Sequence, residues 1–298
     1  ADIARLQMEI GGATGICRQK VSEAEAFVRA GITDVLISNE IRNPLMIDRL
    51  ARLCAGGAKI SVCVDDLEAV SQLEEAAARH ETKITCLVEF ETGGRRCGVT
   101  TLTGLLELAR AVIDADHLTF GGIQAYHGMM QHIVDYDDRR AAAVKSIQHA
   151  NAAVEMLMVN GIKCATVTGG GTGSYAFEAG SRLYTELQCG SYAFMDVDYA
   201  RIEDENGRRC QDFEQALFLL TSVMSTSRAG RAVCDAGLKV QSVDSGLPEV
   251  CDRDDVVYVS ASDEHGTLTD PYGHLVVGDR LRLIPGHCDP TCNLHDWY

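Results

Sequence analysis

The sequence predicts an α/β protein: a (β/α)8 barrel whose first strand is missing, followed by a smaller all-β domain. From residue 1 to about residue 200, short apolar runs alternate with amphipathic stretches at helical spacing, which is typical of β-α units on a parallel sheet. After residue 200 this alternation stops, and β-rich runs separated by turn residues remain. We therefore expect a barrel domain over residues 1–200, a polar linker, and a β-domain over residues 210–298.

Seven apolar runs in the first part are expected to form strands, at residues 14–17, 34–38, 59–64, 84–90, 118–126, 164–168 and 183–194. The helices between them are expected at residues 21–30, 44–53, 67–80, 102–115 and 138–159. Seven strands are one fewer than a closed barrel needs, and a strand upstream of Ala1 would supply the eighth. A doubly wound open sheet has the same periodicity, so periodicity alone leaves both folds open.

Charge and composition exclude several classes of function. The 298 residues carry a formal net charge of −16, whereas nucleic-acid binding needs clustered Lys and Arg, and anionic membranes attract basic surfaces. The sequence contains no apolar stretch long enough to span a membrane. Its 12 cysteines form no C-x-x-C pair and several lie in apolar runs, which predicts free thiols in a reducing, cytoplasmic location.

A glycine-rich segment follows the run at residues 164–168 and reads Thr-Gly-Gly-Gly-Thr-Gly-Ser. Consecutive glycines allow a tight turn and a close approach of the backbone to a ligand, and backbone N–H groups at a helix start can bind an anion. In a barrel, the loops after the last two strands are the usual phosphate site. A turn that binds nothing is the alternative. The candidate phosphate-binding residues are Thr168, Gly170, Gly171, Thr172, Gly190, Ser191 and Tyr192.

A histidine and an aspartate stand two residues apart near the end of the chain, at His287 and Asp289. On an extended backbone, alternate side chains share a face, so both would point the same way while Cys288 points away. One imidazole and one carboxylate suit a divalent ion such as Mn²⁺ or Zn²⁺ and leave positions open for substrate. A surface turn with an incidental histidine is the alternative.

Two further loops carry polar residues at the ends of expected strands. Arg95 and Arg96 lie beside glycines after residues 84–90, and such arginines can bind a cofactor oxygen or a carboxylate, although a solvated loop fits equally. Tyr126, His127 and His132 follow the next run. An isolated histidine in such a loop is more often structural than catalytic, and a second histidine nearby favours a site modestly.

Together and in this order, these motifs resemble the fold-type III pyridoxal-phosphate proteins related to alanine racemase, and among them the D-threonine aldolases and D-serine dehydratases. The resemblance runs through nearly the whole chain. Its motifs are Cys17–Lys20 with Glu23–Glu25, Arg96–Gly98, Ala125–Gly128, the glycine segment, Gly190–Tyr192, Asp235–Gly237, Asp244–Pro248 and His287–Thr291.

The resemblance implies a cofactor, pyridoxal 5'-phosphate, and roles for its binding residues. The glycine segment with Ser191 and Tyr192 would hold the cofactor phosphate, Arg96 would approach the phenolic oxygen, and Tyr126 would lie near the pyridine nitrogen. His287 and Asp289 would hold a divalent metal, for which we expect Mn²⁺ before Zn²⁺, Mg²⁺ or Co²⁺. The resemblance also implies a homodimer.

One element of the family is missing from this sequence. The Schiff-base lysine of the family lies on the first barrel strand, just before the helix that opens this chain. No lysine here stands in a matching motif, neither Lys20, Lys59, Lys83, Lys145, Lys163 nor Lys239. We therefore expect both ends of the chain to be cuts within a longer protein, with the lysine within about ten residues upstream of Ala1.

The activity implied by the resemblance is a metal-activated aldolase. It would cleave D-threonine and related D-β-hydroxy-α-amino acids to glycine and an aldehyde, with the metal on the β-hydroxyl and His132 as the candidate base. One alternative is a D-serine or D-3-hydroxyaspartate dehydratase, which releases a keto acid and ammonia. Such relatives use a His-x-Cys pair that favours Zn²⁺, whereas Asp289 supplies oxygen. A non-catalytic pyridoxal-phosphate-binding protein is the other alternative.

Overall fold

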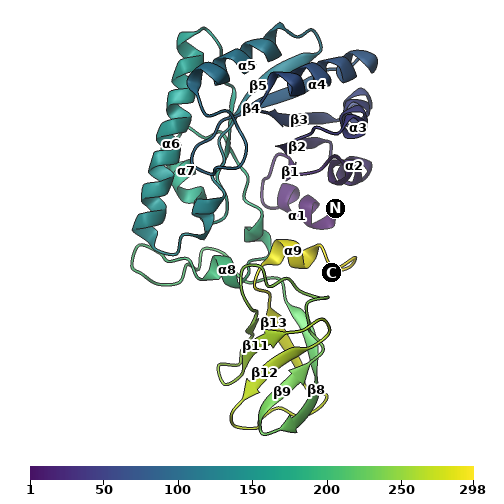
Figure 1. Cartoon of the computed structure of the whole chain (residues 1–298), viewed down its shortest axis with the longest axis vertical. Coiled ribbons are helices and arrows are strands. Elements are labelled where there is room, and N and C mark those ends of the chain that lie inside the picture. The colour runs from purple at the N-terminus through teal and green to yellow at the C-terminus, as the bar shows by residue number, and fades with distance from the viewer. The chain divides into compact units, whose positions relative to one another are not determined.

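The computed structural model describes residues 1–298 and divides into two compact units (Figure 1). We call residues Ala1–Met130 with Arg140–Gln188 the barrel unit, and residues Gln131–Arg139 with Cys189–Tyr298 the β unit. The chain thus passes from one unit to the other at three points, after Met130, Arg139 and Gln188. No helix is long and apolar enough to cross a membrane, and all 12 cysteines are free.

The barrel unit contains seven strands whose spatial order equals their order in the sequence. Every neighbouring pair is parallel. A doubly wound sheet reverses its strand order at a switch point, so the alternative is excluded and the barrel-type prediction is confirmed. The strands are β1 (Ile16–Arg18), β2 (Asp34–Glu40), β3 (Lys59–Val64), β4 (Ile84–Glu89), β5 (Leu118–Gln124), β6 (Thr166–Gly169) and β7 (Glu186–Leu187).

Helices follow the strands and lie outside the curved sheet (Figure 1). They are α1 (Asp2–Glu9), α2 (Val21–Arg29), α3 (Pro44–Ala55), α4 (Leu67–Arg79), α5 (Leu102–Asp114), α6 (Tyr136–Val159) and α7 (Tyr175–Ser181). The side chains of Asn43, Asp66 and Thr101 accept backbone N–H bonds at the starts of α3, α4 and α5, which fixes where these helices begin. Their apolar faces join the strands in one core.

The β unit contains six antiparallel strands in the order β10-β13-β8-β9-β12-β11. Its core includes Val223, Cys234, Tyr258, Leu268 and Leu283, which confirms the predicted all-β texture. The strands are β8 (Leu219–Arg228), β9 (Gly230–Cys234), β10 (Glu249–Val250), β11 (Val257–Ala261), β12 (Gly266–Asp270) and β13 (Arg280–Ile284). Short helices complete the chain: η1 (Met129–His132), η2 (Ser191–Ala193), α8 (Val197–Ala200) and α9 (Cys288–Cys292).

The strand predicted at residues 183–194 is wrong beyond Leu187. The carbonyl of Ser191 accepts the backbone N–H groups of Phe194 and Met195, at 3.0 and 2.7 Å. These local bonds replace a sheet ladder, so Gly190, Ser191 and Tyr192 enter and form η2 rather than a strand.

The extended backbone predicted for residues 287–289 is also wrong. His287 is itself extended, but α9 begins at Cys288 and places Asp289 in its first turn. Pro290 follows in that turn, where a proline has no helical hydrogen bond to lose. Strand alternation therefore does not relate the side chains of His287 and Asp289.

Candidate functional site

Polar side chains meet at the carboxyl ends of four barrel strands. The amide of Gln188 donates to Gln124 and to the Thr168 hydroxyl, at 2.9 Å each. Gln124 in turn donates to the carboxyl of Glu89 at 2.7 Å. Gln124, Thr168 and Glu89 are all buried. Ligands bind at the carboxyl end of a parallel barrel. This network of hydrogen bonds therefore marks the candidate site.

The glycine segment after β6 has a backbone that leaves no room for side chains. A Cβ on Gly169 would lie 2.4 Å from the carbonyl oxygen of Ala125. Gly170 has a φ of +70°, and its Cβ would lie 3.0 Å from Leu187. Thr168 and Thr172 on either side are buried. A glycine turn flanked by buried hydroxyls is a cradle that suits a phosphate group.

Glu178 lies beneath this loop, at 3.2 Å from the position of a Gly170 Cβ. Its side chain is 1% exposed, and the Ser174 hydroxyl donates to one of its oxygens at 2.9 Å. Burial raises the pKa of Glu178 to about 7. A carboxyl with this pKa is about half protonated at pH 7 and carries less negative charge there than an exposed glutamate.

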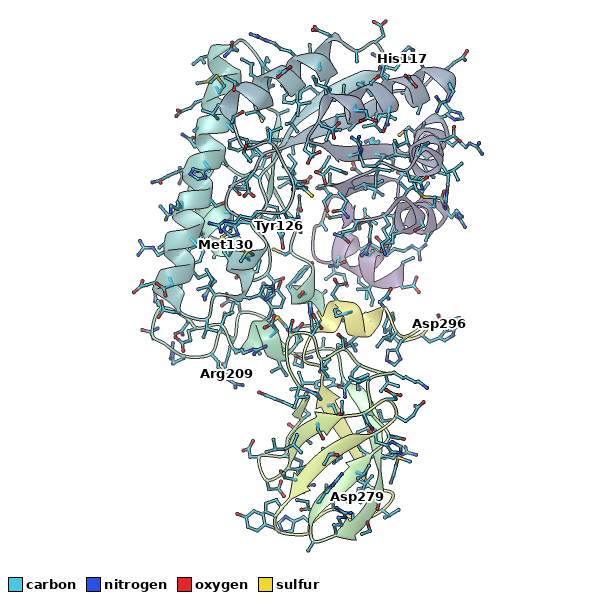
Figure 2. All side chains as sticks on the ribbon, viewed as in Figure 1. His117, Tyr126, Met130, Arg209, Asp279 and Asp296 are labelled. Atoms are coloured by element: carbon cyan, nitrogen blue, oxygen red, sulfur yellow. The ribbon has the colours of Figure 1, made fainter.

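The structure brings Arg96 and Tyr126 together, and their predicted cofactor roles stay predictions. The Arg96 guanidinium lies 5.6 Å from the centre of the Tyr126 ring, a cation–π distance. Tyr126 follows β5 and is labelled in Figure 2. The pKa of Glu89, at the end of β4, is raised well above its usual range, because the carboxyl is buried and lies beside Glu40. Arg96 opposes that shift through its positive charge.

A second polar group at the same sheet edge was not predicted from the sequence. Ligand atoms of Glu40, Asp65 and Cys97 lie within 4.8 Å of one another. Burial and the neighbouring Glu40 raise the pKa of Cys97 to about 12, so this residue is a protonated thiol. Glu40 and Asp65 end or follow adjacent strands β2 and β3. Their signal in the sequence is a carboxylate at the end of an apolar run.

His132 ends η1 and belongs to the β unit. Its Nδ1 lies 2.5 Å from Oδ2 of Asp198, a residue of α8. Arg201 contacts the other oxygen of this carboxylate at 2.7 Å. Sequence reasoning found the histidine but missed Asp198, because nothing near either residue indicates the pairing.

His287 also has a carboxylate partner in the β unit. Its Nδ1 lies 2.8 Å from Oδ2 of Asp244, and the Ser245 hydroxyl is 3.3 Å away. When a carboxylate engages one ring nitrogen, the other is oriented as a metal ligand. Asp289 is exposed in the first turn of α9, whereas Cys288 is buried and its thiol pKa is raised by that burial. The role of His287 and Asp289 as metal ligands stays a prediction.

The remaining predicted phosphate ligands lie in the β unit. Ser191 and Tyr192 form η2, and the Tyr192 ring lies 5.4 Å from that of Phe213. Their predicted contribution to the phosphate pocket stays a prediction.

Two family models match successive parts of the chain. Residues 1–198 match the model of the alanine racemase N-terminal domain. Residues 216–298 match the model of a putative serine dehydratase domain. The chain belongs to the fold-type III family of pyridoxal-phosphate enzymes. Both domain types of this family are therefore represented in one chain.

Individual relatives within this family include two aldolases. The chain is 55% identical over 299 residues to a 3-hydroxy-D-aspartate aldolase of Paracoccus denitrificans strain Pd 1222, a match that covers 100% of this chain and 77% of that protein. It is 43% identical to a D-threonine aldolase of Arthrobacter sp., with 99% of this chain and 77% of that protein covered. The crystal structure of a D-threonine aldolase from Filomicrobium marinum superposes with a TM-score of 0.95 at 44% identity, covering 100% of this chain and 80% of that one.

Proposed function

We propose that this chain is a pyridoxal-phosphate aldolase that cleaves D-β-hydroxy-α-amino acids to glycine and an aldehyde. The main observation for this proposal is that two histidines of the β unit each contact a carboxylate. His132 contacts Asp198 and His287 contacts Asp244. One such histidine suits a base and the other a metal ligand. The relatives named as aldolases support the same reaction class.

The substrate that we favour is 3-hydroxy-D-aspartate, with D-threonine as the second candidate. The relative named for 3-hydroxy-D-aspartate is 55% identical and the one named for D-threonine is 43% identical. Both compounds carry the same α-amino and β-hydroxyl groups and differ in the substituent on the β-carbon. The aldehyde released would be glyoxylate from the first and acetaldehyde from the second.

Residues of the barrel unit would hold the cofactor. Pyridoxal phosphate supplies an electron sink when bound. The glycine loop with Gly170 would bind the phosphate through backbone N–H groups, and Arg96 and Tyr126 would bind the ring.

Residues of the β unit would act on the β-hydroxyl. His287 and Asp289 would hold a divalent ion, Mn²⁺ by preference and otherwise Zn²⁺, Mg²⁺ or Co²⁺, which would supply Lewis-acid chemistry to that oxygen. His132 would take the hydroxyl proton on its Nε2, because its Nδ1 is occupied by Asp198.

The second candidate is a dehydratase, which expels the β-hydroxyl instead of deprotonating it. It is favoured by the match of residues 216–298 to a serine dehydratase domain. Against it, the thiol of Cys288 is buried with a raised pKa, so it is a poor metal ligand, and Asp289 provides oxygen. A non-catalytic cofactor-binding protein would not need the two partnered histidines.

The proposal also includes the oligomeric state and the cellular location of the protein. We expect a homodimer, which light scattering would detect, and a monomer with full activity would contradict this. We expect a cytoplasmic location, since the chain keeps 12 free thiols.

Product analysis tests the proposed reaction. The full-length protein, loaded with pyridoxal phosphate and Mn²⁺, would be incubated separately with D-threonine and 3-hydroxy-D-aspartate. We expect glycine with acetaldehyde or glyoxylate, and faster turnover of 3-hydroxy-D-aspartate. Ammonia with 2-oxobutanoate or oxaloacetate, and no glycine, would establish the dehydratase instead.

Variants at the metal residues give the matched control. Asp289→Ala should lose metal affinity and activity together while cofactor binding persists, because its carboxylate is exposed and does not support the core. Cys288→Ala should keep its metal affinity. If Cys288→Ala loses the metal and Asp289→Ala does not, the assignment of oxygen donors is wrong.

A further inference from the structure

The carboxylate of Asp198 is held from two sides. His132 Nδ1 lies 2.5 Å from one oxygen and Arg201 Nη2 lies 2.7 Å from the other. The Asp198 side chain is 12% exposed. A carboxylate between two such donors has little freedom to rotate, and it keeps a strong hydrogen-bond acceptor beside one ring nitrogen of His132.

The backbone around Asp198 is fixed as firmly as its side chain. Its N–H donates to the carbonyl of Gly286 at 3.2 Å, and Val197 N–H donates to Pro285 at 3.0 Å. The buried carboxylate of Asp196 accepts the N–H of Cys288 at 2.7 Å. These hydrogen bonds therefore hold helix α8 against the segment that carries His287.

Arg201 extends this connection to the second histidine. Besides Asp198, its Nη2 donates to the carbonyl oxygen of Ser245 at 2.5 Å. Ser245 follows Asp244, whose carboxylate lies 2.8 Å from His287 Nδ1. One continuous set of contacts within the β unit thus runs from His132 to His287. A shift of either histidine would therefore disturb these contacts.

We propose that Asp198 is the positioning residue of His132, an inference that rests on the aldolase function proposed above. Asp198 accepts a hydrogen bond from Nδ1–H, so the neutral ring keeps its lone pair on Nε2. Nε2 then takes the proton of the β-hydroxyl as the O–H bond breaks. The O–H electron pair forms the aldehyde C=O as the Cα–Cβ bond breaks. The Cα–Cβ electron pair leaves with Cα, and a proton from solvent adds there to give glycine. Asp198 stabilises the imidazolium formed on His132.

The alternative is that the His132–Asp198 ion pair only stabilises the fold. A second ion pair in the chain provides a matched control. Asp255 bridges an arginine and a histidine in the same way: Arg253 Nε lies 2.7 Å from one oxygen and His274 Nδ1 lies 2.9 Å from the other. Both triads belong to the β unit. Asp255→Asn therefore removes the same type of contact without touching His132.

The first measurement is spectroscopic. ¹⁵N spectra of the histidine-labelled holoenzyme at pH 8.5 should show His132 as the Nδ1–H tautomer, with its resonance assigned by its loss in His132→Gln. A wild-type ring protonated on Nε2 overturns the proposal, whatever the variants do. This spectrum is read without turnover, so it separates the positioning role from the aldolase function itself.

The second measurement is kinetic. In the holoenzyme, Asp198→Asn should lower kcat by roughly 100-fold or more and change KM by less than about threefold, since the base is lost rather than substrate binding. Asp255→Asn should change neither. The double variant Asp198→Asn/His132→Gln should be no slower than His132→Gln alone, because both act through one group.

The outcomes distinguish the two ideas. An active aldolase whose kcat is unchanged by Asp198→Asn, or whose two substitutions act additively, refutes the positioning role. An inactive wild type with the predicted tautomer refutes the aldolase and leaves the hydrogen bond intact.

Discussion

Glu178 makes the folding stability of the chain depend on pH in a calculable way. In the folded protein its pKa is about 7, raised by burial from the ordinary value of 4.5. Between these values the folded state binds the proton more tightly than the unfolded chain, so stability falls as pH rises. The full loss is about 3 kcal/mol, of which roughly 2.5 kcal/mol falls between pH 5 and pH 8.

Glu178→Gln should remove this dependence, because a glutamine stays neutral at every pH. Urea unfolding of the cofactor-free protein at pH 5, 6, 7 and 8 would give the free energy of unfolding for both proteins. The difference between variant and wild type should grow by about 2.5 kcal/mol over this range, while Glu75→Gln, at an exposed glutamate of α4, should stay parallel to wild type. Parallel curves for Glu178→Gln would refute the buried-acid reasoning.

Three other substitutions test other parts of the structure. Gly122→Ala places a Cβ 1.9 Å from the carbonyl oxygen of Thr166 at a φ of +145°, so thermal unfolding should show a loss of more than about 3 kcal/mol or no folded protein. Gly170→Val forces a β-branched residue to a φ of +70° and places its Cβ 3.0 Å from Leu187 and 3.2 Å from Glu178, so the loop must shift. The Kd for pyridoxal phosphate should rise at least about tenfold in an absorbance titration; an unchanged Kd would remove the loop from the site. Asp196 accepts two buried backbone N–H groups, one of them on Cys288. Asp196→Ala leaves both without an acceptor and should lower the free energy of unfolding by about 3 kcal/mol in urea. Asp196→Asn keeps a carbonyl oxygen and should lower it less.

Most of the fold followed from the sequence because apolar runs and helical periodicity are local signals. The predicted strand at residues 59–64 matches β3 at both ends, and the predicted helix at residues 102–115 ends one residue beyond α5. The barrel topology needed more than periodicity. The sequential strand order decided it, and strand order is a property of tertiary pairing.

The errors occurred where distant side chains determine the backbone. Asp196 binds the first N–H of α9, so the shape of the segment after His287 depends on a residue far away in the chain. The pairing of Asp198 and Asp244 with their histidines was missed for the same reason, since each contacts a histidine that is distant in the sequence. The histidines were singled out from the sequence alone, because a histidine after an apolar run is noticeable without its partner, and their roles stay predictions.

The β unit is discontinuous in the chain, and this limits how such a protein can be built from parts. Its first segment, residues Gln131–Arg139, is encoded inside the barrel unit. Buried Arg139 of this segment donates to the carbonyl oxygens of Val134 and Glu203, at 2.9 and 2.6 Å. A gene fragment that begins at Cys189 therefore loses both this arginine and His132. Exchange of the β unit between relatives at a single junction would therefore combine His132 from one parent with Asp198 from the other.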